Sequence, residues 1–279
     1  MIIDAHTHIF PESIAKRAIE SLEKTAEKGA GKKDALKANT DGTLDGLKRS
    51  MQKNGIDYSV ILPVATKPSQ FDNINAYATE INGKDGIISF GGIHPDCENV
   101  YEKLSHIKSL GLRGVKVHPD YQQCYVDNPK YLEIVEACIK LGLYITFHAG
   151  WDIGYPDPMH CSPEAFAKAY TPLFEKYPAE KEHPHVILAH LGGVTTAKRT
   201  LETLCGLPIY LDMAFTLGNM DVSDIVKIIR THGADRVLFA TDSPWADQGE
   251  YKQKFFSLPL TDEEKELIAY KNAYSIFIE

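Results

Sequence analysis

Short runs of apolar, often β-branched residues alternate with amphipathic stretches along nearly the whole chain. Eight of the apolar runs have the length and composition of β-strands. They cover Met1–His6, Tyr58–Leu62, Gly86–Ile93, Arg113–His118, Leu143–His148, His185–His190, Ile209–Met213 and Arg236–Thr241. Apolar residues at helical spacing predict helices over Pro11–Lys28, Leu44–Lys53, Tyr131–Leu141, Ala197–Leu204 and Val222–His232. Strands that alternate with helices in this way are typical of a parallel sheet built from βαβ units.

Eight strand-then-helix units fit one closed barrel. A chain of 279 residues has the length that a (β/α)8 TIM barrel needs, so we predict an α/β fold with one such domain over residues 1–279. A doubly wound open sheet is the competing fold, but no Gly-x-Gly-x-x-Gly follows the first predicted strand. We find no linker that would divide the chain into two domains.

Three glycines at predicted helix ends and two long connections between predicted elements add to this picture of the fold. Gly142, Gly206 and Gly233 follow predicted helices, where a left-handed residue commonly ends a helix. The connection Phe10–Gly42 is longer than a minimal crossover and is either a covering lid or an inert insertion. The connection Gly150–Pro163 follows directly from a strand end, and loops of this kind supply substrate contacts in a barrel.

Composition and charge narrow the class of protein. The chain is 43% hydrophobic and 24% charged, with a net charge of −8, and no run of Lys or Arg resembles a nucleic-acid footprint. No 18-residue apolar stretch predicts a transmembrane helix, and the chain begins directly with a strand rather than a signal peptide. Five scattered cysteines fit free thiols in a reducing cytoplasm. We therefore expect a cytoplasmic protein that binds neither nucleic acid nor membrane.

Histidine or aspartate stands at the ends of many predicted strands. The strand-end residues are His6, His8, Lys116, His118, His148, His190 and Asp242. In a barrel these ends meet at the face that carries catalytic groups. Residues two apart on a strand share one side, so His6 and His8 can reach the same metal ion. Together with His148 and Asp242 they make a zinc ligand set that leaves room for a water, whose pKa the metal would lower.

The same segments resemble the metal-dependent amidohydrolase superfamily. The chain is most similar to its amidohydrolase-related branch, which includes aminocarboxymuconate-semialdehyde decarboxylase and related hydrolases and decarboxylases. The matching segments are IIDAHTHIFP, GVKVHPD, ITFHAG, VILAHLGG and VLFATDSPW, followed by KNAYSIF near the end. They occur in order and together span the whole chain.

The resemblance implies roles for individual residues. His6, His8, His148 and Asp242 match the metal ligands of the branch, which usually holds one ion, and we expect Zn²⁺ with Mn²⁺ or another divalent metal as the alternative. Asp242 and His190 match the residues that move protons or polarise the substrate. Relatives that hold two metal ions use a carboxylated lysine or a glutamate to bridge them. Lys116 lies on the corresponding strand, so a two-metal site with a carboxylated Lys116 is the alternative. The resemblance also implies a homodimer.

Other residues have a functional and a structural interpretation. For Lys116 and His118, a substrate-binding role and a structural role are equally supported by the sequence. Trp151 and Tyr155 lie in the Gly150–Pro163 connection, where they would either line the pocket or pack the loop. We predict all four as substrate-binding residues, and the substrate as a small polar molecule.

Hydrolysis of an amide, a lactone or a related carbonyl is the first functional hypothesis, because attack by a metal-bound hydroxide needs nothing more. Non-oxidative decarboxylation of a small carboxylic acid is the alternative, and it requires a cation to hold the carboxylate. Arg113 faces away from Lys116 on its strand, so no arginine is obviously placed for that task. A non-enzymatic metal-binding barrel is the rival from another class.

Overall fold

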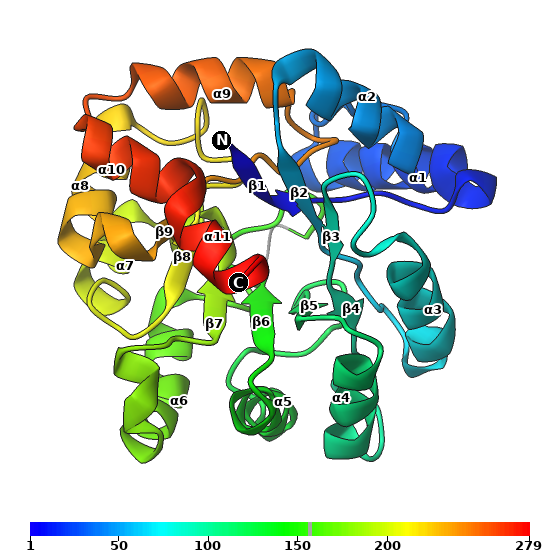
Figure 1. Cartoon of the computed structure of the whole chain (residues 1–279), viewed down its shortest axis with the longest axis vertical. Coiled ribbons are helices and arrows are strands. Elements are labelled where there is room, and N and C mark those ends of the chain that lie inside the picture. Colours follow the sequence, from blue (N-terminus) through cyan, green and yellow to red (C-terminus); the bar gives the residue numbers. More distant parts are fainter. Residues whose placement is uncertain (156–157) are drawn as a thin grey trace.

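Parallel β-strands and helices alternate through the computed structural model, which describes residues 1–155 and 158–279. The strands are β1 Ile3–Thr7, β2 Tyr58–Ile61, β3 Ile87–Ser89, β4 Gly91–Gly92, β5 Gly114–Val117, β6 Tyr144–Phe147, β7 Val186–Leu188, β8 Tyr210–Asp212 and β9 Val237–Leu238. The α-helices are α1 Glu12–Ala30, α2 Leu44–Asn54, α3 Phe71–Ile81, α4 Val100–Ser109, α5 Pro129–Leu141, α6 Pro163–Lys176, α7 Ala197–Thr203, α8 Val222–His232, α9 Gln248–Ser257, α10 Asp262–Glu266 and α11 Asn272–Phe277. Helices surround the strands on the outside (Figure 1).

The strands close into a barrel. β1, β2 and β3 form one parallel group, and β4 to β9 form another in sequence order. β3 and β4 are the two halves of one predicted strand, interrupted at Phe90, whose amide donates to the carbonyl of Ile61 at 2.9 Å. The last strand meets the first through a bond from the amide of Ala5 to the carbonyl of Phe239 at 2.9 Å. The predicted (β/α)8 barrel is therefore confirmed.

The predicted helices agree well with the structure, whereas several strands are shorter than predicted. Helix α8 has the predicted bounds, and Gly142 ends α5 in the left-handed conformation with φ of 66°. Gly206, in contrast, lies beyond the residue that caps α7. β7 stops at Leu188, since His190 adopts φ of 61° in a tight turn over Ala189–Gly192. A residue in that region cannot continue a strand.

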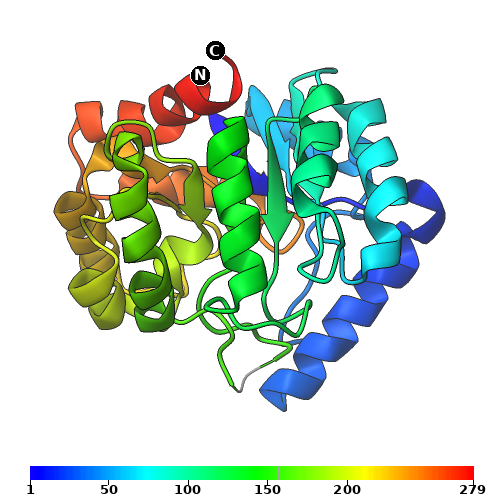
Figure 2. The same cartoon turned by 90° about the horizontal axis from the view of Figure 1, so that it is seen from below.

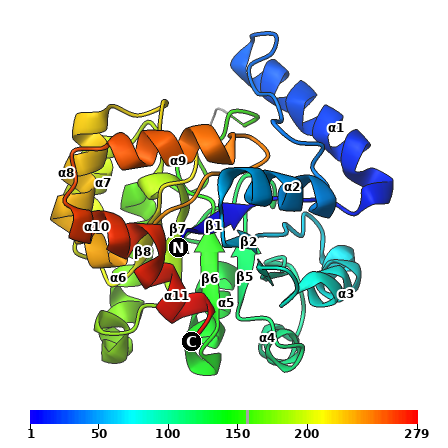
Figure 3. The same ribbon diagram turned by 45° about the horizontal axis from the view of Figure 1, so that its top comes forward.

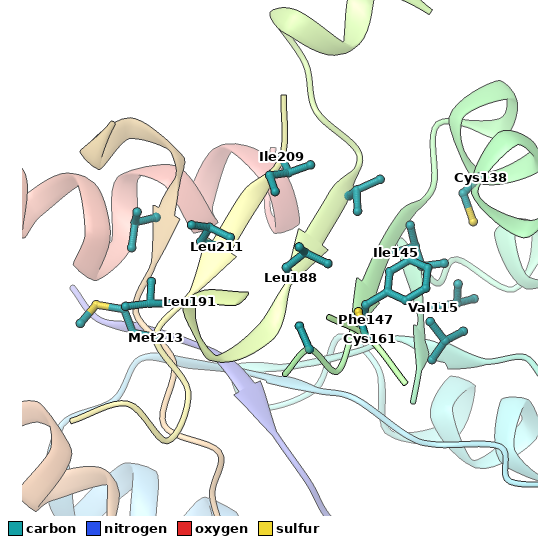
Figure 4. Packing of buried hydrophobic residues seen from close by; sticks show 14 of the residues in the cluster. Val115, Cys138, Ile145, Phe147, Cys161, Leu188, Leu191, Ile209, Leu211 and Met213 are labelled. Atoms are coloured by element: carbon teal, nitrogen blue, oxygen red, sulfur yellow. The ribbon is translucent and has the colours of Figure 1, made fainter. Parts of the chain in front are cut away.

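Strand alternation divides the apolar core into two layers. Side chains such as Val115, Phe147 and Leu188 point outward and pack under the helices (Figure 4). An inner cluster that includes Phe90 fills the barrel, and its ring meets that of Phe277 from α11 with centroids 5.6 Å apart. Apolar packing therefore closes the end of the barrel near the termini, which leaves the other end for polar side chains.

Helix α1 and the loop after β6 lie together at that other end. Figures 2 and 3 show the C-terminal end of α1 reaching the loop, and Figure 2 shows both chain termini on the opposite side. A Cβ atom at Gly29 would overlap the carbonyl oxygen of Ile153. After α1, the amide of Asn39 donates to the carbonyl of Pro244 at 2.7 Å. The insertion thus covers part of the barrel mouth. Among the described residues, no helix has the length and apolarity to cross a bilayer.

Candidate metal centre

A bulge near the end of β1 aims two histidines into the barrel mouth. The register with β2 shifts between Asp4 and Thr7, which marks one extra residue on β1. Ala5, before the shift, packs among the apolar side chains inside the barrel. His6 and His8 then reach side chains from β5, from β8 and from the segment after β9. The bulge therefore lets apolar packing and the polar site share one short strand.

His6, His8 and Asp242 form one group of potential metal ligands. The Nε2 atoms of the two histidines lie 3.0 Å apart, and Oδ1 of Asp242 lies 3.5 and 3.2 Å from them. On the far side of each ring, Nδ1 of His6 donates to Oδ2 of Asp212 at 2.8 Å, and Nδ1 of His8 donates to the carbonyl of Leu62 at 2.9 Å. Both acceptors fix the ring hydrogen on Nδ1, so both Nε2 atoms carry lone pairs.

This group fits a divalent cation. Two lone pairs and a carboxylate oxygen face one another at distances where they repel unless a positive charge lies between them. Burial, the nearby Lys116 and the other histidines lower the pKa of His6 well below its ordinary value, although Asp242 opposes this shift. Burial alone would raise the pKa of Asp242, but its contacts with His8 and with the other neighbouring histidines bring it below its ordinary value. Neutral imidazole and carboxylate are the forms that bind metal.

Lys116 supplies a positive charge beside this group. It is the only buried lysine or arginine in the described part of the chain, and its Nζ lies 3.2 Å from Nε2 of His6. Burial lowers the pKa of Lys116 to about 8, and the charges of Asp212 and Asp242 oppose that shift. Lys116 belongs to β5 and shares the inward face with His118, as the strand parity predicts.

His190 connects this group to His148. Nδ1 of His190 donates to the carbonyl of Ala214 at 2.8 Å, and its amide donates to Oδ1 of Asp212 at 3.0 Å. Its Nε2 lies 3.0 Å from Nδ1 of His148, and its ring centroid is 5.4 Å from that of His6. His148 thus contacts His190, whose ring in turn lies beside that of His6. That His148 binds the same ion as His6 stays a prediction.

A second group of potential ligands consists of His118, His148 and Asp152. Asp120 lies beside it, with Oδ2 3.9 Å from Nε2 of His148. Burial lowers the pKa of both imidazoles well below the ordinary value. Burial also raises the pKa of Asp152 to about 7, helped by the charges of Asp120 and Asp242 and opposed by the amide of Gly154.

Of the predicted substrate-binding residues, His118 belongs to this second group and Tyr155 lies near it. Tyr121 stacks on His118 with ring centroids 3.8 Å apart, and the ring of Tyr155 lies 5.4 Å from that of Tyr121. Tyr155 is 36% exposed, and Trp151 is half-buried. The remainder of their loop includes residues 156 and 157, which lie outside the described residues. That Lys116, His118, Trp151 and Tyr155 contact substrate stays a prediction.

Three residues of the site were missed by the sequence analysis, namely Asp120, Asp152 and Asp212. Asp212 ends β8 on the inward face, so strand parity could have identified it. Asp120 and Asp152 each follow a strand-end histidine within four residues. His160 donates to Asp120 across the loop at 2.9 Å, a contact between distant residues that no local pattern announces.

Known structures share this barrel. An uncharacterised TIM-barrel protein from Bordetella bronchiseptica has a TM-score of 0.73 and 18% identity, over 99% of this chain and 97% of that one. A dihydroxybenzoic acid decarboxylase from Polaromonas sp. JS666, with bound manganese and the inhibitor 2-nitroresorcinol, has a TM-score of 0.71 and 16% identity, over 99% and 96%. The structure of 5-carboxyvanillate decarboxylase from Sphingomonas paucimobilis has a TM-score of 0.67 and 14% identity, over 99% of this chain and 98% of that one. At these identities the likeness is one of fold.

Sequence comparison gives the family. No curated protein sequence matches this chain. The sequence model described as "Amidohydrolase", however, matches residues 3–277, a span that begins with β1 and its histidine pair and ends in α11. It includes every residue of both ligand groups. With this match over nearly its whole length, the chain belongs to the amidohydrolase family.

Proposed function

We propose that this protein is a metal-dependent decarboxylase of small carboxylic acids. Its divalent ion, Zn²⁺ or Mn²⁺, would be held by His6, His8 and Asp242, with His148 as the predicted fourth ligand. The observation that carries the choice of reaction is Lys116, a buried cation 3.2 Å from His6. Decarboxylation needs a positive charge for the substrate carboxylate, and the sequence had offered no arginine for this task.

Lys116 would bind the carboxylate of the substrate from the floor of the site. The exposed fractions of the side chains differ, at 1% for His6, 17% for His8 and 13% for Asp242. Substrate would therefore approach from the side of His8 and Asp242, and its carboxylate would reach inward to the ammonium. When bound, the divalent ion supplies Lewis-acid polarisation of the substrate oxygens.

The reaction breaks the bond between the carboxylate and its carbon. The electron pair stays on that carbon, CO₂ departs, and a proton takes its place. We assign delivery of that proton to Asp242, the carboxylate of the first ligand group, which would take the proton from a solvent water before the step and be ionised again after it. His190 would orient the substrate from the opposite side, because its bonds to Ala214 and to Asp212 fix its ring.

Release of CO₂ tests this proposal. The Mn²⁺-loaded and the Zn²⁺-loaded protein are each incubated with 2,6-dihydroxybenzoate, 5-carboxyvanillate and aliphatic 2-oxo and 2-hydroxy acids, and CO₂ is measured by membrane-inlet mass spectrometry. The reverse of the protonation step is measured separately, as deuterium uptake from D₂O into resorcinol. We expect CO₂ from at least one acid, and its loss in Asp242→Asn but not in His106→Ala, whose side chain lies exposed on α4. Absence of CO₂ release and of deuterium uptake would overturn the proposal.

Hydrolysis remains the second candidate. It is favoured by the low pKa of Asp242, which suits a carboxylate that accepts a proton from an attacking water. A parallel panel of lactones, amides and esters separates the two reactions. Turnover on that panel without CO₂ release would assign hydrolysis, whereas metal binding without turnover on either panel would favour a non-enzymatic barrel.

A further inference from the structure

Asp4 is a buried acidic residue in β1, two residues before the first predicted metal ligand. Its exposed fraction is 0%. Oδ1 of Asp4 accepts from the amide of Thr241 at 2.9 Å, and Oδ2 accepts from the hydroxyl of the same residue at 2.6 Å. Oδ2 also accepts from Nε2 of Gln248, the first residue of α9, at 2.7 Å. One carboxylate therefore binds both the backbone and the side chain of the residue that precedes Asp242.

The hydroxyl of Thr241 connects Asp4 to the residue on the other side of Asp242. The oxygen that donates to Asp4 also accepts from the amide of Ser243 at 3.0 Å. An ionised carboxylate can only accept, so the hydroxyl hydrogen points to Asp4 and a lone pair of the hydroxyl points to the amide. These two bonds form a hydrogen-bond chain with a fixed direction, which we call the Asp4–Ser243 chain.

Asp242, which this chain encloses, has an uncommon backbone conformation. Its φ of 72° lies in the left-handed region, which residues other than glycine adopt only where surrounding contacts hold them. The amide of Asp242 donates to the carbonyl of His6 at 2.9 Å, and the carbonyl of Ser243 accepts from the amide of His8 at 2.6 Å. The backbone on both sides of Asp242 is therefore tied to the two histidines, and the direction of its carboxylate depends on this turn.

Gln248 binds the same carboxylate but does not belong to the Asp4–Ser243 chain. Its Nε2 donates to Asp4 and lies 3.3 Å from the hydroxyl of Ser59 on β2. Within the described part of the chain, its Oε1 is buried without a hydrogen-bond partner. A carboxylate attracts the amide hydrogens and repels the amide oxygen, so an ionised Asp4 holds Gln248 in this orientation although the oxygen stays unpaired.

We propose that Asp4 is a positioning residue for the metal centre and acts through the Asp4–Ser243 chain. It holds the left-handed turn that directs the carboxylate of Asp242 into the first ligand group, where Oδ1 lies 3.5 and 3.2 Å from the two histidine nitrogens. The groups of such a site must be held within about 0.5 Å of their working geometry. Loss of the chain therefore weakens metal binding without removing a ligand. This inference rests on the metal site of the proposed function but not on the reaction.

The Zn²⁺ affinity of the folded chain tests this role. The full chain is stripped with dipicolinate, and Kd is measured by competition with a chromophoric chelator. Thr241→Val keeps the shape of the side chain but removes the hydroxyl, and we expect it to raise Kd by roughly 10-fold. Thr241→Ser keeps the hydroxyl and should bind as wild type does. Asp4→Asn should also raise Kd, because asparagine has one acceptor oxygen for the two bonds from Thr241.

Gln248→Met is the matched control. It removes the bond from α9 to Asp4 and leaves the Asp4–Ser243 chain intact, so it should lower the free energy of unfolding but leave Kd unchanged. Urea unfolding of each metal-free variant measures that free energy and establishes that the variant is folded. A loss of stability alone does not change Kd in a chain that stays folded. If Asp4→Asn does not fold, the comparison of Thr241→Val with Thr241→Ser decides.

Three outcomes would overturn the proposal. One is a wild-type Kd in both Thr241→Val and Asp4→Asn. Another is a Kd that rises as much in Thr241→Ser as in Thr241→Val, which would assign the effect to packing of the methyl group. The third is a Kd that rises as much in Gln248→Met as in Asp4→Asn. If the Kd values are as expected but no CO₂ is released, the decarboxylase proposal fails and this one stands, whereas a wild type that binds no Zn²⁺ overturns both.

Discussion

The Nδ1 of His6 donates to Oδ2 of Asp212 at 2.8 Å, and both side chains are about 1% exposed. The other oxygen of Asp212 accepts from the amides of His190 and Ala214, both at 3.0 Å. One buried carboxylate therefore fixes the ring hydrogen of a predicted metal ligand and the backbone of the neighbouring turn. Carboxylates in this position orient a ligand and raise its basicity.

We predict that Asp212→Asn weakens Zn²⁺ binding at the first ligand group by roughly 10- to 100-fold. Asparagine has one acceptor oxygen, so either His6 or the two amides lose their partner. Competition with a chromophoric chelator measures the affinity. Asp72→Asn, an exposed aspartate on α3, is the matched control and should leave the affinity unchanged. An unaltered affinity in Asp212→Asn would show that the bond to His6 does not support metal binding.

Removal of single ligands should reduce the metal content in whole steps. His6→Ala and Asp242→Ala are each expected to bind one equivalent less than wild type. They should also lose the thermal stabilisation that this ion provides, which is about 3 kcal/mol when the free metal is 100 times Kd. Calorimetry with and without added Zn²⁺ measures that difference. Metal content equal to wild type in either variant would remove that side chain from the ligand set.

The charge of Lys116 predicts how activity depends on pH. Burial lowers its pKa to about 8, so the ammonium is present below that pH and is lost as the pH rises through it. The KM of a carboxylate substrate should therefore rise above about pH 8. Lys116→Met should raise KM by roughly 10- to 100-fold and abolish this alkaline change, because a hydrogen bond to a charged group is worth about 1.5–3 kcal/mol. Lys168→Met, exposed on α6, is the control. An identical alkaline limb in Lys116→Met would assign the titration to another group.

The alternation of strands with helices was sufficient to predict the barrel, and strand parity was sufficient to predict the inward direction of Lys116 and His148, because a period of two is a local property. The inward direction of His6 depends on the bulge in β1, which parity does not predict. Parity also could not predict the end of β7. The left-handed φ of His190 is imposed by tertiary contacts with Asp212, which lies 22 residues further along the chain. The partners of His148 were also beyond a local pattern.

Two aspartates in loops show why a local pattern could not predict the partners of His148. Asp152 belongs to the irregular loop after β6, and its direction depends on the bond from the amide of Gly154 and on the position of α1. Asp120 follows His118-Pro119, and its orientation depends on His160, 40 residues away. A second ligand group therefore became visible only in three dimensions.

A surface network between α5 and α6 predicts an acid-dependent loss of stability. Glu136 accepts from Lys176 and Tyr177 at the end of α6 and forms an ion pair with Lys140. These bonds lower its pKa from 4.5 to about 2. The folded-state pKa is depressed, so the stabilisation is complete above pH 4.5 and is lost as the pH falls towards 2. Its side chain is 26% exposed, so screening by water reduces the effect.

We therefore expect Glu136→Gln to lower the free energy of unfolding by about 1 kcal/mol at neutral pH, and by progressively less as the solution is acidified. Urea unfolding at a series of pH values measures this difference. Glu133→Gln lies on the same helix with an exposed side chain and should change the free energy little at any pH. A cost for Glu136→Gln that stays constant below pH 4.5 would contradict the assigned pKa shift.

Two glycines with the same backbone conformation should respond differently to alanine. Gly150 and Gly206 have φ of 86° and 88°, so each substitution carries the cost of a left-handed alanine, roughly 1–2 kcal/mol. Around Gly206, no atom of the described residues lies within 4 Å of an added Cβ. At Gly150 the added atom would overlap Cα of Gly193. The atoms of Gly193 in this contact belong to the backbone, which cannot rotate away as a side chain can.

Gly150→Ala should therefore cost about 1–3 kcal/mol more than Gly206→Ala, measured by urea unfolding of the two variants side by side. Because Gly150 lies two residues after His148 in the chain, the displaced backbone should also weaken Zn²⁺ binding through His148, the predicted fourth ligand, whereas Gly206→Ala should leave it unchanged. Equal costs in the two variants would mean that the loop after β6 can move away from Gly193 freely. In that case the close packing of these two backbones would not position Asp152, and the second ligand group would depend on the loop's other contacts.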